Sequence, residues 1–104
     1  MKIIDGIDYV SLAEAKRVAR RVADCLRRRY GATKVLVFGS VVDGFYVPGH
    51  SDIDIYFEGV PREDEMSVTG RLMLDFADYD IDFRPAGLCH PRFKASVLAE
   101  GLAI

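Results

Sequence analysis

The sequence predicts one α/β domain of the α+β type, in which a small mixed β-sheet is covered by helices. One long stretch has helical hydrophobic periodicity, three short stretches have strand character, and two further helical stretches lie between and after the last strands. Three short strands alone could not bury their faces, so helices must cover the sheet. The expected order is α-β-β-α-β-α over residues 1–104, a length that fits a single domain.

The first helix is expected from Leu12 to Tyr30. Ser11 has the position of an N-cap, Glu14 that of its capping-box partner, and Gly31 that of a C-terminal stop. Between these ends an apolar stripe recurs at helical spacing, which indicates a helix packed along one side. The stripe comprises Ala15, Val18, Ala19, Val22 and Leu26.

The other elements follow from changes in periodicity. Residues 34–38 form an apolar, β-branched run that is typical of a strand buried on both faces. Residues 52–57 and 79–84 alternate polar and apolar side chains, which predicts two further strands with their acids on one face. A loop with at most one helical turn is expected over 41–51. A second helix is expected from Pro61 or Arg62 to near Phe76, and a last helix from Pro91 to Gly101. The first turn of the second helix carries the acids Glu63, Asp64 and Glu65, which complement the helix dipole.

Composition narrows the function classes. Residues 1–34 hold nine Lys and Arg against four acids, and residues 35–104 hold five against twelve, for a net charge of −2. The acidic second part argues against strong nucleic-acid binding, because duplex affinity comes mainly from neutralised phosphates. There is no apolar run near the roughly 18 residues of a membrane helix. The N-terminus lacks a signal-peptide core and two cysteines make no disulfide framework, so we expect a cytoplasmic protein without a membrane partner.

Two expected strands each place a pair of acids on one face. The pairs are Asp52 with Asp54, and Asp80 with Asp82. Either pair alone is explained by a strand that faces water. Both pairs beside a Gly-Ser turn in one small domain indicate a cation site instead, because gathered carboxylates repel one another unless a cation lies among them. Oxygen-only ligation suits Mg²⁺.

Gly39 and Ser40 directly follow the buried strand. Glycine permits a close backbone approach, and the exposed N–H groups and the Ser40 hydroxyl can donate to phosphate oxygens. Most Gly-Ser turns are plain turns, so this pair matters only together with the acids. Neither the P-loop nor the Rossmann glycine pattern occurs.

Residues 37–40 (Val-Phe-Gly-Ser) and, with eleven residues between Ser40 and Asp52, residues 52–55 (Asp-Ile-Asp-Ile) resemble the signature of the DNA polymerase β-like nucleotidyltransferase superfamily. Residues 79–83 (Tyr-Asp-Ile-Asp-Phe) are similar to the strand that carries its third carboxylate. The length resembles the minimal nucleotidyltransferases, which often act beside a HEPN-domain protein as the antitoxin of a toxin–antitoxin pair.

This resemblance implies the polymerase β-like fold and a two-metal, Mg²⁺-dependent transfer of a nucleoside monophosphate, with AMP from ATP favoured, to a hydroxyl on a partner protein. It implies that Asp52 and Asp54 hold the Mg²⁺ that carries the nucleotide, and that Asp82 completes a second metal site. Asp80 points the same way, so either acid could be the third ligand, and the spacing favours Asp82. The implied nucleotide-binding residues are Gly39 and Ser40.

Asp43 departs from the resembled pattern, in which an arginine is common. A carboxylate there would repel substrate phosphates, so Asp43→Arg is expected to tighten ATP binding; alternatively, Asp43 caps its own turn. Two functions therefore stay open: an enzyme, and an antitoxin that neutralises a HEPN-type ribonuclease by binding alone. A larger-substrate transferase would lack its second domain. A homo-oligomer is compatible with either function.

Overall fold

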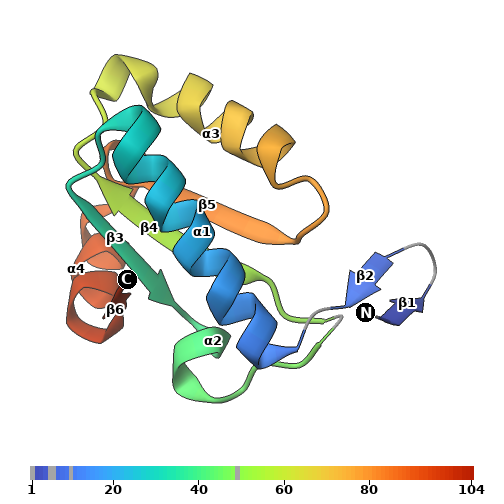
Figure 1. Cartoon of the computed structure of the whole chain (residues 1–104). Helices are drawn as coiled ribbons and strands as arrows, with labels where there is room; N and C mark the ends of the chain where they lie inside the picture. Colours follow the sequence, from blue (N-terminus) through green and yellow to red (C-terminus); the bar gives the residue numbers. More distant parts are fainter. Residues whose placement is uncertain (1, 5–6, 10, 49) are drawn as a thin grey trace.

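A computed structural model of the chain describes residues 2–4, 7–9, 11–48 and 50–104, with side chains in the last two ranges. Its centre is a four-stranded sheet in the order β5-β4-β3-β6 (Figure 1). β4 runs antiparallel to β3 and parallel to β5, which confirms the predicted mixed sheet. The strands are β3 (Lys34–Phe38), β4 (Ile53–Glu58), β5 (Ile81–Pro85) and β6 (Leu102–Ala103).

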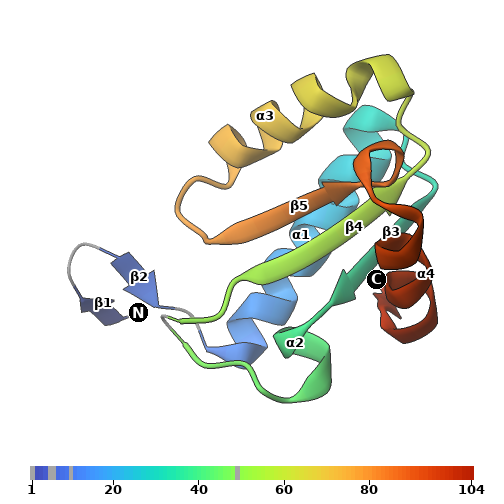
Figure 2. The ribbon, with the colours of Figure 1, turned by 180° about the vertical axis from the view of Figure 1, so that it is seen from behind.

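Helices cover both faces of this sheet, as Figures 1 and 2 show from opposite sides. α1 (Leu12–Tyr30) and α3 (Glu65–Asp75) pack on one face, and α4 (Pro91–Glu100) packs on the other. None of the described helices has the length and apolar character needed to cross a lipid bilayer. The short helical segments are α2 (Ser40–Asp43), η1 (Arg62–Asp64) and η2 (Ala86–Leu88).

The larger core lies between the sheet and the pair α1 and α3. Ile55 and Phe57 of β4 have no exposed surface, and Leu72 of α3 is equally buried against them. On the other face α4 covers a smaller cluster of Leu36, Tyr56 and Val97. Because both faces are covered, β3 is buried in its middle on both sides, as its apolar sequence predicts.

The predicted ends of α1 are confirmed. The Ser11 Oγ accepts a hydrogen bond from the Glu14 N–H at 3.2 Å, and Gly31 has a left-handed φ of 74°. The apolar stripe of α1 is buried as expected. β3 keeps its predicted bounds, whereas β4 and β5 begin one and two residues later than the alternating patterns at 52–57 and 79–84 indicate.

Three short strands lie outside the predicted element order. β1 (Lys2–Ile4) and β2 (Ile7–Tyr9) form a separate antiparallel pair, and β6 adds to the free side of β3. In that pairing Leu102 lies opposite Val37. Strands of two or three residues are too short to show a hydrophobic period, so the sequence pattern could not reveal them.

Two glycines provide a test of the packing. Gly59 ends β4 with a φ of 97°, and a Cβ there would lie 2.6 Å from the backbone nitrogen of Thr33. Gly59→Ala should therefore lower the free energy of unfolding by about 1–3 kcal/mol. Gly70 lies within α3 and a Cβ there meets nothing within 4 Å, so Gly70→Ala should raise it by about 0.5–1 kcal/mol. Urea denaturation of both variants measures these changes in the free energy of unfolding. Equal changes in the two variants would contradict this packing.

Candidate active site

The pairing of three strands brings Asp52, Asp54 and Asp82 together. Asp54 on β4 lies opposite Phe38 of β3 on one side and opposite Asp82 of β5 on the other. Asp52 immediately precedes β4. One carboxylate oxygen from each acid lies within 4.8 Å of those of the other two, and all three side chains are half-buried. We call these residues the acid cluster.

The apolar residues of β4 fix the direction in which its acids point. Ile53, Ile55 and Phe57 are buried against α1 and α3, so the alternation of the strand sends Asp54 to the opposite face. Tyr56 shares that face and is fully buried in the cluster under α4. The acids therefore lie at the beginning of β4, before the part of the strand that holds Tyr56.

Asp80, the alternative third ligand, lies outside the acid cluster. Its side chain is exposed, and its carbonyl accepts a hydrogen bond from the Ile53 N–H at 2.9 Å just before β5 begins. Asp82 is two residues further along and is the direct register partner of Asp54. Among the described residues the geometry thus groups Asp82, and not Asp80, with the first two acids.

The acid cluster perturbs the protonation of Asp54. Burial, and then the neighbouring carboxylates of Asp52 and Asp82, raise the pKa of Asp54 to about 7. Arg84 acts in the opposite direction, but its guanidinium is held by Asp82, with Nε and Nη2 each 3.0 Å from Asp82 Oδ2. Arg84 also lies over the Phe93 ring, 5.2 Å from its centre. The arginine therefore balances Asp82 more than Asp54.

Gly39 and Ser40 adjoin the acid cluster. Gly39 has a φ of 70°, and a Cβ there would collide with the Asp54 carboxylate, so only glycine fits between β3 and α2. Ser40 begins α2 immediately afterwards. Within α2 the N–H groups of Val42 and Asp43 donate to the Gly39 carbonyl at 3.0 Å each, so the N–H groups of Ser40 and Val41 are the ones that the start of this helix leaves unbonded. Ser40 thus follows directly after the close approach of Gly39 to Asp54, and its hydroxyl and N–H are candidate phosphate donors.

The acid cluster fits a hard divalent cation. It offers three carboxylates from converging strands, and oxygen ligands are the ones that Mg²⁺ prefers. Burial and the neighbouring carboxylates raise the pKa of Asp54, so the protein alone disfavours the charged form of this residue. A cation among them would remove that repulsion, and a nucleoside triphosphate would supply further oxygen ligands.

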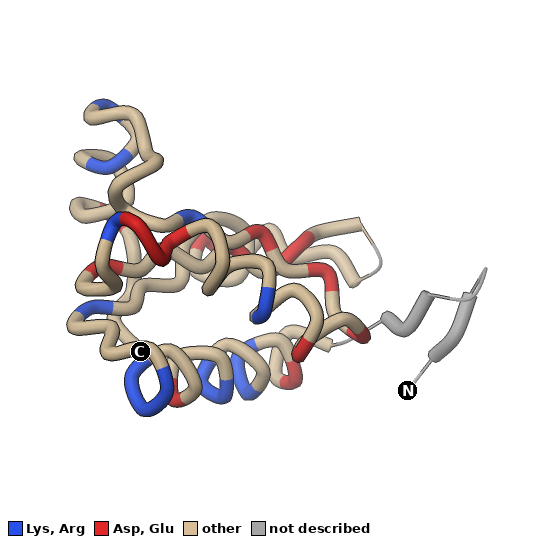
Figure 3. The backbone as a smooth tube through the Cα atoms, turned by 90° about the horizontal axis from the view of Figure 1, so that it is seen from above, with Lys and Arg blue, Asp and Glu red and all other residues tan. Residues whose placement is uncertain are grey.

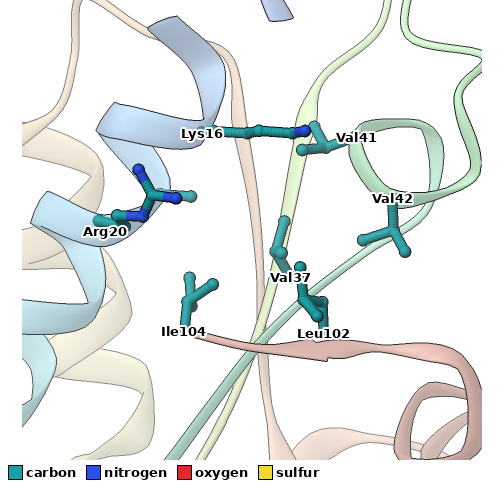
Figure 4. A pocket seen from close by; sticks show the side chains of 8 residues that line it. Lys16, Arg20, Val37, Val41, Val42, Leu102 and Ile104 are labelled. Carbon is teal, nitrogen blue, oxygen red and sulfur yellow. The ribbon is translucent and has the colours of Figure 1, made fainter. Parts of the chain in front are cut away.

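A pocket of about 160 Å³ lies on the other face of the sheet from the acid cluster (Figure 4). The Lys16 side chain reaches from α1 toward Val41 of α2, and Arg20 lies near Ile104. Apolar side chains make up the rest of its wall, and none of the three acids belongs to it. The acid cluster is therefore separate from this cavity.

Charge is divided between the elements. Basic positions recur along α1, whereas acidic positions recur on the strands and around α3 (Figure 3). The basic residues of α1 are exposed, as is typical of a solvated helix face. The acid cluster thus lies in the acidic part of the molecule, which suits the gathering of a cation.

Two residues have structural roles that bear on the site. The Asp43 Oδ1 accepts a hydrogen bond from the Phe45 N–H at 3.0 Å, which is the turn-capping alternative considered above. Glu65 is only 4% exposed and its Oε2 accepts from the Gly87 N–H at 2.8 Å, so it anchors η2 beside β5. Sequence reasoning assigned Glu65 to the helix dipole only, because its partner lies 22 residues away and leaves no local pattern.

A small α+β domain with a glycine-serine turn next to a carboxylate cluster is the class of protein that fold and site define. The sequence model of the nucleotidyltransferase domain family matches residues 19–103, and the chain belongs to this family. Family membership supports transferase activity and implies a nucleotide substrate. A search of the curated proteins gave no match.

The raised pKa of Asp54 makes stability depend on pH. The pKa of Asp54 is about 7 in the folded chain, whereas the pKa of an aspartate in the unfolded chain is roughly 4. Between these two pKa values the folded state binds more protons than the unfolded state. The free energy of unfolding should therefore fall as the pH rises from about 4 to about 7. Asp54→Asn should flatten this slope in urea denaturation without divalent cations. The matched control Asp78→Asn changes an exposed acid outside the cluster and should keep the pH slope. An unchanged slope in Asp54→Asn would contradict the assignment of this slope to Asp54.

Proposed function

We propose that this chain is a Mg²⁺-dependent nucleotidyltransferase that transfers AMP from ATP to a hydroxyl of a partner protein. In this proposal it is the antitoxin of a toxin–antitoxin pair, and the partner is a HEPN-domain protein. The observation that carries the proposal is the acid cluster of Asp52, Asp54 and Asp82 beside Gly39 in a chain of the nucleotidyltransferase domain family.

Each part of the site has a role in such a transfer. Asp52 and Asp54 are the proposed ligands of the nucleotide-bearing Mg²⁺, and Asp82 is the proposed third ligand. Bound Mg²⁺ would neutralise phosphate charge and lower the pKa of the acceptor hydroxyl. The Ser40 hydroxyl and N–H would donate to phosphate oxygens, since Gly39 lets the backbone approach.

The proposed chemistry is a displacement at the α-phosphorus. The acceptor oxygen forms a bond to the α-phosphorus while the bond to the pyrophosphate oxygen breaks, and the hydroxyl proton leaves to solvent. Little covalent chemistry falls to the protein, so positioning and charge stabilisation account for catalysis. Asp82 also lines a pocket of about 370 Å³, and this supports an acceptor carried by another protein, because a macromolecular hydroxyl can reach the acid from there.

A second candidate function is that of a binding module, an antitoxin that blocks its partner by occlusion. The observation in its favour is Asp43, which stands where the resembled pattern commonly has an arginine. Its carboxylate also has a structural use, since it holds the Phe45 N–H. The two functions differ in whether the acids are needed for neutralisation.

Labelling separates the two functions. With labelled ATP, Mg²⁺ and the protein encoded next to it, the wild type should transfer label to that partner. Asp82→Asn should bind the partner but lose at least about a hundredfold in labelling, since it removes a metal-binding carboxylate. Asp78→Asn, an exposed acid outside the acid cluster, is the matched control and should label normally. If wild type and Asp82→Asn neutralise the partner equally and neither labels it, the enzyme is contradicted and the binding module stands.

Asp43 can be tested with two substitutions that separate charge from turn capping. Asp43→Asn keeps an acceptor for the Phe45 N–H and removes the negative charge, so it should bind ATP several-fold more tightly at unchanged stability. Asp43→Arg should also tighten binding, with a gain that shrinks as salt rises, but should lower the free energy of unfolding by about 1 kcal/mol because it loses the capping bond. Calorimetric titration at two salt concentrations measures this. Unimproved affinity in both variants would mean that Asp43 serves the turn alone.

A further inference from the structure

β5 is an edge strand of the central sheet, at the opposite end from β6 (Figure 2). The Asp80 carbonyl accepts from the Ile53 N–H of β4, and alternate residues of a strand present their backbone groups to opposite sides. Ile81 and Phe83 therefore present their N–H and C=O groups away from β4. No strand in the described part of the chain pairs with them.

Two cavities flank this open edge, one on each side of Phe83, which lines both. The first has a volume of about 370 Å³ and the second about 240 Å³. α3 supplies a flexible methionine to each, Met66 to the first and Met73 to the second, with 69% and 58% of their surfaces exposed. We call the edge of β5 together with these two cavities the edge groove.

The edge groove offers what an added strand requires. The outward N–H and C=O groups of Ile81 and Phe83 are available to pair with a further strand. The side chains of Met66 and Met73 are apolar and can adapt to different side chains of that strand. Thr69 lines the first cavity, and its hydroxyl is buried without a hydrogen-bond partner among the described residues.

The edge groove is continuous with the acid cluster. Asp82 belongs to the cluster and also lines the first cavity, and Asp80 lines the second. Only Arg84 contributes a positive charge to these two cavities, and it is paired with Asp82. Such a lining repels the phosphates of a nucleic acid and complements a chain with basic side chains.

We propose that the edge groove binds an extended segment of the protein substrate, which adds a strand to β5 and presents its hydroxyl side chain beside Asp82. Alternate side chains of that segment point to opposite faces. Apolar residues face the methionines of α3, while the hydroxyl and its basic neighbours face the acids. That the bound segment is a substrate, and which group it receives, rests on the proposed function, but its pairing with β5 does not.

The probe is the peptide acetyl-Lys-Val-Lys-Val-Tyr-Val-Lys-Val-amide, added without nucleotide or divalent cation. The amide signals of Ile81 and Phe83 should shift saturably in nuclear magnetic resonance spectra, and their hydrogen exchange should slow. N-methylation of one alternate set of peptide amides should abolish binding, and N-methylation of the other set should leave it intact. Binding that survives both methylation patterns, as a helical partner or side-chain contact alone would give, overturns the proposal.

Protein variants give an independent measure. Ile81→Pro removes one outward N–H at the first residue of β5 without removing a bond to β4, and should weaken binding about fivefold; Ile81→Val keeps the N–H and is its control. Met66→Gln with Met73→Gln should also weaken binding. Leu74→Gln changes a side chain of α3 that is 78% exposed and lies outside the groove lining, so it should not.

Labelling then separates this proposal from the proposed function. Pairing at β5 without transfer of label from ATP to the peptide tyrosine upholds the edge groove and contradicts the transferase. Transfer of label with no change at Ile81 and Phe83 upholds the transferase and overturns the edge groove.

Discussion

The pairing register of β4 between its two neighbours is the constraint on which the site depends. Ile53 and Ile55 face the core under α1 and α3, and this fixes the side on which Asp54 emerges. The same register sets Asp54 opposite Asp82 of the parallel strand. A slip of one residue would turn the apolar set outward and the acids into the core, so the burial that stabilises the sheet also maintains the acid cluster.

The carboxylates of the acid cluster repel one another, and the folded chain holds them close together despite this repulsion. Three carboxylates converge, the pKa of Asp54 is raised by burial and by its neighbours, and the nearby guanidinium is bound to Asp82. Gly39 admits this closeness because any side chain at its position would collide with Asp54. An arrangement that costs stability in the free protein is understandable if a cation and its nucleotide complete it, because the repulsion then becomes ligation.

The sequence predicts the parts of the fold that have a strong local signal. α1 begins and ends at its expected caps, and the alternation around Asp54 places the acids on one face, because both patterns depend on neighbouring residues. The choice between Asp80 and Asp82 depends on the register between strands, which no local pattern contains. The burial of Glu65 against η2 and the pairing of β6 with β3 are likewise contacts between distant segments, so they became visible only in three dimensions.

The most direct measurement of the central claim is a carboxyl-carbon nuclear magnetic resonance titration of the aspartates, with and without Mg²⁺. Asp54 should titrate near pH 7 in the free protein, in line with its pKa of about 7. With saturating Mg²⁺ its titration should move to well below its usual range near 4, because the cation competes with the proton. Titration of Asp54 near pH 4 in the free protein, unchanged by Mg²⁺, would contradict a cation site at these three acids.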